Sequence, residues 1–196
     1  MNLANKITIA RVILVPIFMI FLLVRVIPYG EFWSAAIFIL AAATDSLDGY
    51  VARKQKSITK FGKFMDPLAD KLLISAALIS LVALNALSPW VAFLIISREF
   101  AVTGLRLVAA GEGVVIIANK WGKFKTVAQI VMVVTLIVDM ALKANIYPPG
   151  DWLRSLLVLY PASTISYLAL LIAIILTLFS GFYYFYENKN LIRLSK

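Results

Sequence analysis

The chain contains no cysteine and no histidine among its 196 residues. Without cysteine it cannot form a disulfide, use a thiolate nucleophile or build a cysteine-based zinc site. Without histidine it lacks the commonest general base and the commonest ligand of transition metals. Its chemistry therefore depends on carboxylates, amines, guanidinium groups or hydroxyls. With oxygen ligands dominant, the expected metal ions are hard ones such as Mg²⁺ or Mn²⁺.

Charged residues are also scarce, at 15% of the chain, whereas 62% of the residues are hydrophobic. A soluble domain is only about 45–50% apolar, and the mean hydropathy here is +0.93. The apolar residues form long blocks separated by short polar segments. This composition predicts an all-α integral membrane protein.

Six apolar segments approach the length of about 20 residues that a membrane-spanning helix needs. Glycine and proline mark turns between them, at residues 28–30, 88–89, 111–113 and 148–150. The polar residues before the first span form an N-terminal juxtamembrane segment. Because no soluble segment remains, we expect residues 1–196 to form a single membrane domain. The predicted spans cover about residues 9–27, 32–52, 64–84, 90–110, 121–142 and 156–186.

Most of the 19 basic residues fall on the N-terminal side of the membrane in this six-span arrangement. Only Arg25, Lys143 and Arg154 fall on the opposite side. Since lysine and arginine accumulate in cytoplasmic loops, both termini are predicted to lie in the cytoplasm, with the protein in the cell membrane. The net charge of +9 favours contact with anionic lipids or phosphorylated substrates. No nucleic-acid-binding motif is visible, so nucleic acid is not an expected partner.

Four aspartates are concentrated at the predicted cytoplasmic ends of two spans. Asp45 and Asp48 lie near the end of the second span, and Asp66 and Asp70 near the start of the third. Each carboxylate costs about 2.5–3.5 kcal/mol at membrane depth, so such a cluster needs compensation. Residues three or four apart share a helix face, and the short basic loop between the spans makes them antiparallel neighbours. We therefore expect the four carboxylates to converge on one pocket and bind one or two divalent ions.

Small and basic residues accompany these aspartates. Gly49, Ala52 and Gly62 leave room for a bulky ligand, and Arg53 can pair with a phosphate through two parallel hydrogen bonds. The set indicates a site for a metal-bound diphosphate, with one carboxylate acting as a base towards a hydroxyl. The alternative is a group of charges that merely cap two helix ends. The number and spacing of the aspartates disfavour that alternative.

The complete pattern runs Asp-x2-Asp-Gly-x2-Ala-Arg-x8-Gly-x3-Asp-x3-Asp, from Asp45 to Asp70. It resembles the signature of the CDP-alcohol phosphatidyltransferases at every defining position. Asn5, Thr8 and Arg11 are similar to the N-terminal segment of that family, and six spans match its usual architecture. The resemblance thus covers essentially the whole chain. It implies a homodimer, and a reaction in which CDP-diacylglycerol and an alcohol give a phosphodiester lipid and CMP.

The same resemblance implies roles for individual residues. Asp45, Asp48 and Asp66 would hold two Mg²⁺ or Mn²⁺ ions, and Asp70 would share in that shell. Asp70 would also be the catalytic base that deprotonates the acceptor hydroxyl. The cytidine diphosphate site would be lined by Asp45, Gly49, Ala52, Arg53 and Gly62.

The acceptor alcohol is inferred from three further cations. Arg106, Lys123 and Lys125 are predicted on the same side of the membrane as the aspartates, where they can hold an anionic acceptor. The pair Arg98–Glu99 and the segment from Gly122 to Thr126 resemble the branch of the family whose acceptor is sn-glycerol 3-phosphate. Phosphatidylglycerol and inositol phosphate remain open as acceptors. The alternative for the three cations is ordinary loop charge on the cytoplasmic side.

Two ion pairs are expected near or within the spans. Arg98 should pair with Glu99 or with the motif carboxylates, and Asp139 should pair with Lys143 four residues later. A function of another class, a small cation carrier, would use the carboxylates as an ion pathway. Transport sites usually lie near the membrane midplane, whereas these aspartates lie at one end of their spans.

Overall fold

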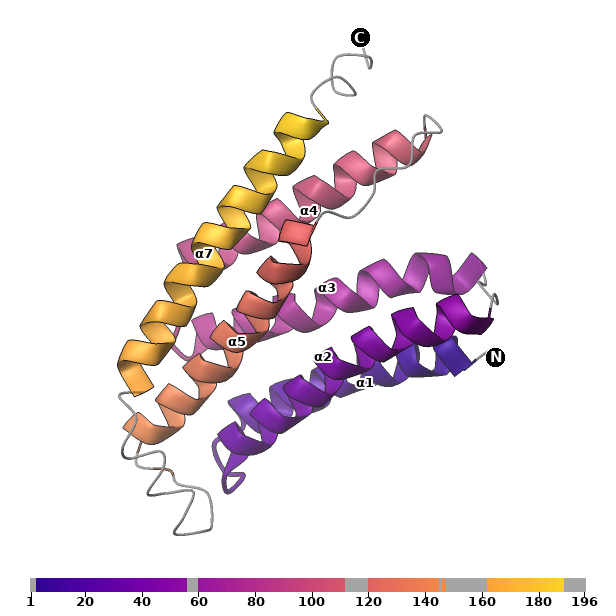
Figure 1. Cartoon of the computed structure of the whole chain (residues 1–196). Helices are drawn as coiled ribbons and strands as arrows, with labels where there is room; N and C mark the ends of the chain where they lie inside the picture. Colours follow the sequence, from indigo (N-terminus) through magenta and orange to yellow (C-terminus); the bar gives the residue numbers. More distant parts are fainter. Residues whose placement is uncertain (1–2, 56–59, 112–119, 145, 147–161, 189–196) are drawn as a thin grey trace.

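The computed structural model describes residues 3–55, 60–111, 120–144, 146 and 162–188, with side chains for 8–44, 71–109, 121–144, 146 and 163–188. Within these residues every regular element is an α-helix, which confirms the predicted all-α fold for this part of the chain (Figure 1). The helices are α1 (Leu3–Leu23), α2 (Gly30–Gln55), α3 (Lys60–Ala83), α4 (Pro89–Gly111), α5 (Lys120–Lys143) and α7 (Ala162–Glu187).

The helices form two groups, the first of α1, α2 and α3 and the second of α4, α5 and α7, which meet chiefly where α2 packs against α5. α1 packs against both α2 and α3, while α5 packs against α7 and α2, and α4 packs against α7 and α3. The end of α2 and the start of α3 lie together at the end of the bundle where the N-terminus lies (Figure 1). The two helices that carry the aspartates therefore run antiparallel and contact each other, as the sequence predicts.

Helix α1 begins and ends earlier than the predicted first span. It begins at Leu3, so the predicted juxtamembrane segment forms its first turns in the described structure. Thr8 and Arg11, each only 2% exposed, lie on its buried face. Hydropathy marks where a helix enters the apolar layer, whereas backbone hydrogen bonding continues beyond that boundary. The polar start of the chain therefore belongs to the same helix as the apolar run.

Two turns depend on residues that tolerate unusual backbone geometry or crowding. Tyr29 has a φ of 57°, and the next residue, Gly30, begins α2. A Cβ atom at Gly30 would lie 2.4 Å from the carbonyl oxygen of Phe21, so glycine permits the close approach of this turn to α1. Asn85, also with a φ of 57°, follows α3, and asparagine is among the few residues that adopt this left-handed conformation readily. Pro89 then starts α4, a helix position that suits proline.

The last predicted span, at about residues 156–186, corresponds to α7 from Ala162 onward. The expected start of that span falls outside the described residues. Among the described side chains, the segments Trp121–Lys143 and Ser163–Glu187 are each long and apolar enough to cross a membrane.

The interior of the bundle combines apolar packing with buried polar side chains. The rings of Phe18 and Phe38, both fully buried, lie 5.5 Å apart between centroids at the α1–α2 contact. Polar residues are buried as well, whereas large apolar side chains such as Ile175 and Phe182 are 62% and 74% exposed. Apolar exteriors and inward-facing polar groups are typical of helix bundles in lipid. The buried polar residues of the second group of helices include Lys125, Gln129, Ser166, Thr177 and Ser180.

Candidate active site

The acidic motif spans the end of α2 and the first half of α3. Asp45 and Asp48 belong to α2, and Asp66 and Asp70 belong to α3. The helical backbone places each pair on one face of its helix. The side chains from Asp45 to Asp70 lie outside the described ones, so the convergence of the carboxylates stays a prediction. The same holds for the predicted nucleotide-site residues Gly49, Ala52, Arg53 and Gly62.

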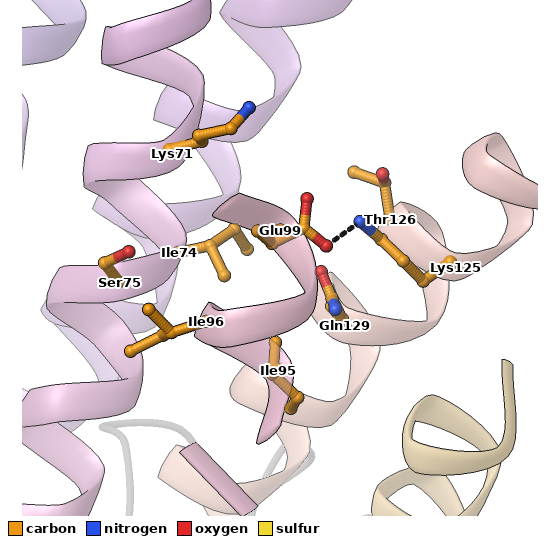
Figure 2. A pocket seen from close by; sticks show the side chains of 9 residues that line it. All are labelled: Lys71, Ile74, Ser75, Ile95, Ile96, Glu99, Lys125, Thr126 and Gln129. Carbon is orange, nitrogen blue, oxygen red and sulfur yellow. Dashed lines mark hydrogen bonds and ion pairs between the residues drawn. The ribbon is translucent and has the colours of Figure 1, made fainter. Parts of the chain in front are cut away.

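A pocket lies beside the acidic segment, between α3, α4 and α5 (Figure 2). Its first lining residue, Lys71, directly follows Asp70 in α3, so the pocket lies within about one helical turn of the motif. It encloses about 330 Å³, including the part that opens to the outside. The lining is completed by Ile74, Ser75, Ile95, Ile96, Glu99, Lys125, Thr126 and Gln129.

Glu99 is the acidic group of this pocket. Its Oε1 atom accepts a hydrogen bond from Nζ of Lys125 in α5, as Figure 2 shows. The same oxygen accepts one from Nη1 of Arg98 at 3.2 Å. This ion pair confirms the predicted pairing of Arg98 with Glu99. Lys125 is buried, with 4% of its surface exposed, so one carboxylate oxygen holds two cations away from bulk water.

Arg98 connects this carboxylate to α7. Its Nη2 atom donates a 2.9 Å hydrogen bond to Oγ of Ser180. The next residue of α7, Gly181, lies beside the Arg98 side chain, because a Cβ atom there would be only 3.1 Å from Cγ of Arg98. The absence of a side chain at Gly181 thus makes room for the arginine between the two helices.

A second polar contact, made by a residue of the pocket wall, joins α5 to α7. Nε2 of Gln129 donates a 3.1 Å hydrogen bond to Oγ1 of Thr177, and both residues are essentially fully buried. Gln129 also lines the pocket. Because a buried amide without a partner is costly, this bond fixes the orientation of one pocket wall.

The three cations predicted for the acceptor occupy different environments. Lys125 lines the pocket, whereas Lys123 is exposed and lies outside its lining. Residues two apart on a helix point in different directions, which explains why the two lysines separate. Arg106 also lies outside the lining and donates a 2.8 Å hydrogen bond from Nε to the hydroxyl of Tyr184. The acceptor role of these three residues stays a prediction.

The structure adds pocket residues that the sequence did not assign to a site, chiefly Lys71 and Glu99. Lys71 also lies within electrostatic reach of Glu99. The signal that could have found both is their charge within an apolar span, since charged side chains there usually face the bundle interior. Among the described side chains, Arg98 and Lys125 contact the Glu99 carboxylate, and Lys71 lines the same pocket. This surplus of positive charge suits an anion.

Comparison with known proteins decides the family. A sequence model described as CDP-alcohol phosphatidyltransferase matches residues 1–186. The chain belongs to the CDP-alcohol phosphatidyltransferase family. This membership confirms the resemblance seen in the motif between Asp45 and Asp70.

Relatives within the CDP-alcohol phosphatidyltransferase family cover most or all of the chain. A protein of Bacillus subtilis (strain 168), named CDP-diacylglycerol–glycerol-3-phosphate 3-phosphatidyltransferase, is 46% identical across 99% of this chain and 98% of its own length. A Rickettsia bellii protein with the same name is 33% identical across 96% of each chain. A Mycobacterium tuberculosis protein, named probable phosphatidylglycerophosphate synthase, is 44% identical across 67% of this chain and 64% of its own length.

Proposed function

We propose that this protein transfers the phosphatidyl group of CDP-diacylglycerol to sn-glycerol 3-phosphate, giving phosphatidylglycerophosphate and CMP. The observation that carries the proposal is the Bacillus subtilis relative of that name, 46% identical over nearly the full length of both chains. The structure supports it with a cationic pocket that begins one residue after Asp70. An anionic acceptor and an acidic metal-binding segment would then lie side by side.

The acidic motif is proposed to bind the metal ions and the nucleotide part of CDP-diacylglycerol. Asp45, Asp48, Asp66 and Asp70 hold Mg²⁺ or Mn²⁺, with two ions proposed. The donor set fits, because it is all carboxylate oxygen on two contacting antiparallel helices. A bound divalent ion neutralises the diphosphate and makes CMP a better leaving group. The binding site for the cytidine diphosphate is lined by Asp45, Gly49, Ala52, Arg53 and Gly62.

Asp70 is the proposed catalytic base. It takes the proton from the acceptor hydroxyl, whose oxygen forms a bond to the phosphorus that carries diacylglycerol. The bond between that phosphorus and the oxygen bridging to the cytidine phosphate breaks, and CMP leaves with the electron pair. Asp70 is suited to this role by position, since Ile74, four residues later on the same face of α3, lines the pocket in which the acceptor is proposed to bind.

The acceptor phosphate is proposed to bind Lys125, with Arg106 and Lys123 contributing from nearby. A phosphate monoester carries about −1.5 to −2 charges at neutral pH. The pocket is lined by Lys71, Lys125 and the carboxylate of Glu99, and Arg98 pairs with Glu99 from outside the lining. These described side chains carry a surplus of positive charge that a dianion nearly balances. An acceptor without a phosphate would leave that surplus uncompensated.

The whole chain, residues 1–196, is proposed to form one membrane domain with six spans. The six described helices contain 21 to 26 residues, which corresponds to about 30–40 Å. That length matches a hydrocarbon core of about 30 Å. We further propose cytoplasmic termini, an active site at the cytoplasmic leaflet of the cell membrane, contact with anionic lipids and a homodimer. The bias of the basic residues supports this orientation.

The experiment is CMP release by the purified protein reconstituted in lipid vesicles with CDP-diacylglycerol and Mg²⁺. Glycerol 3-phosphate, inositol phosphate and phosphatidylglycerol are compared as acceptors at equal concentrations. We expect CMP and a new phosphodiester lipid with glycerol 3-phosphate. Product with only one of the other two acceptors would overturn the acceptor assignment. No CMP with any acceptor, together with cation flux across the vesicle membrane, would favour a carrier.

A further inference from the structure

A chain of polar contacts runs from α7 through α4 to α5 and ends in the pocket. Ser180 accepts a hydrogen bond from Arg98, Arg98 pairs with Glu99, and Glu99 accepts a hydrogen bond from Lys125. We propose that Glu99, itself held by Arg98, is a positioning residue that fixes the Lys125 ammonium where the acceptor phosphate binds. The inference rests on the proposed function, because it presupposes a phosphate-bearing acceptor in this pocket.

The argument begins with the flexibility of lysine. An ammonium group is a point charge on a stem of four carbons, so its position must be set by what it contacts. Glu99 is the carboxylate that lines the pocket among the described side chains, and Lys125 donates directly to it. Since an ammonium has three donors, a bond to Glu99 leaves Lys125 able to bind a phosphate oxygen at the same time.

Glu99 is in turn held by a group that is anchored elsewhere. The guanidinium of Arg98 is planar and rigid, and its two terminal nitrogens reach two different helices. Nη1 contacts Glu99 at 3.2 Å, and Nη2 contacts Ser180 of α7 at 2.9 Å. The carboxylate is therefore fixed relative to the interface between α4 and α7, rather than by its own side-chain preferences alone.

The balance of charge favours positioning over competition. A carboxylate that merely occupied Lys125 until the acceptor arrived would lower the affinity for phosphate. Among the described side chains, Arg98 and Lys125 contact Glu99 and Lys71 lines the same pocket, so a surplus of positive charge remains when Glu99 is ionised. Removing the carboxylate takes away the contact through which Glu99 holds the ammonium and leaves three cations that repel one another.

The test is steady-state kinetics of Glu99→Gln, which keeps the size of the side chain and removes its charge. We expect the KM for glycerol 3-phosphate to rise about tenfold, with kcat within about threefold and the KM for CDP-diacylglycerol within about twofold. Asp139→Asn is the matched control, because Asp139 pairs with Lys143 at 2.7 Å in another part of α5. A KM for glycerol 3-phosphate that is unchanged or lower, or an equal loss for both substrates, would overturn the proposal.

A double-mutant cycle tests whether Glu99 acts through Lys125. In Lys125→Met, adding Glu99→Gln should change the acceptor KM by less than about twofold, because the group that Glu99 positions is gone. Independent, multiplying effects would contradict the mechanism. If Lys125→Met is too slow to measure, Glu99→Asp is used instead to test whether the carboxylate is what sets the acceptor affinity. This variant keeps the carboxylate and should recover at least half of the lost acceptor affinity on a logarithmic scale, and no recovery would overturn the proposal.

The acceptor preference of the wild-type enzyme distinguishes failure of the proposed function from failure of the proposed role of Glu99. If it uses a different phosphate-bearing acceptor, the assignment of glycerol 3-phosphate fails while the same comparison of KM values still tests Glu99. If it uses only an acceptor without a phosphate, the role of Glu99 fails as well.

Discussion

Nε of Arg106 in α4 donates a 2.8 Å hydrogen bond to the hydroxyl of Tyr184 in α7, and Cζ of Arg106 lies 5.3 Å from the centre of the same ring. Tyr184 is buried and Arg106 is exposed, so a buried phenol holds an exposed guanidinium in place. The contact lies near the ends of both helices. An arginine proposed to help bind the acceptor is thus already positioned by α7.

Replacing Tyr184 with phenylalanine removes the hydroxyl and keeps the ring. Because hydrogen bonds between helices in membranes contribute about 0.6 kcal/mol on average and at most about 1.7 kcal/mol, we expect a small loss of stability in this range. Thermal unfolding in detergent measures it. Tyr183→Phe, at the adjacent and more exposed position, is the control. Equal melting temperatures for the two variants would show that the hydroxyl of Tyr184 does not stabilise the α4–α7 contact.

Asp70→Asn tests the proposed base. The amide cannot accept the proton from the acceptor hydroxyl, and general base catalysis contributes about 10²–10⁴-fold, so kcat should fall by that factor. Binding of CDP-diacylglycerol should change much less, because Asp45, Asp48 and Asp66 remain. CMP release measures the rate and equilibrium binding measures the affinity, with Asp139→Asn as the control outside the motif. A rate close to that of the wild type would remove Asp70 from this role.

Removal of divalent metal should abolish CMP release, and Mg²⁺ or Mn²⁺ should restore it. A metal that binds only the folded protein also stabilises it, by about 2.7 kcal/mol when its concentration is 100 times its Kd. The melting temperature of the metal-free protein should therefore rise when Mg²⁺ is added. The rise should be smaller in Asp45→Asn, which lacks one of the proposed ligands. CMP release that continues at an unchanged rate in excess chelator would contradict a metal-dependent reaction.

The local ion pairs were predictable from sequence, whereas the long-range polar contacts were not. Arg98 with Glu99, and Asp139 with Lys143, are neighbours in sequence or on a helix face, and both pairs form. The contact of Lys125 with Glu99 depends on how α4 and α5 are rotated about their own axes and on which helices lie next to them. Hydrophobic periodicity does not determine that rotation where almost every face is apolar.

The helix boundaries show a similar division. Glycine and proline marked the turns before α2 and α4, because they permit backbone geometry or contacts that other residues resist. The left-handed Asn85 in the turn before α4 was not singled out from the sequence. The start of α1 at Leu3 was missed, because the polar residues before the apolar run were interpreted as a separate segment. Thr8 and Arg11 are buried in the bundle, which explains why this polar segment is part of α1. Their burial depends on how the other helices pack against α1, which the sequence of this segment alone does not show.

Gly181→Ala tests how closely Arg98 is held against α7. A Cβ atom at this position would lie 3.1 Å from Cγ and 3.3 Å from Nε of Arg98, so the arginine must shift. Because Arg98 is bonded to both Ser180 and Glu99, a shift weakens at least one of these contacts. Gly104→Ala in α4 is the control, since a Cβ atom there meets nothing within 4 Å.

Both substitutions replace a helical glycine with alanine, which by itself favours the helix by about 1 kcal/mol. We expect Gly104→Ala to show this gain and Gly181→Ala to be less stable than Gly104→Ala by about 1–3 kcal/mol, the usual cost of overpacking. The acceptor KM should also rise in Gly181→Ala, by about threefold, because the arginine that holds Glu99 has moved. Equal melting temperatures and equal KM values in the two variants would mean that Arg98 adjusts freely, and that its contact with α7 does not position Glu99.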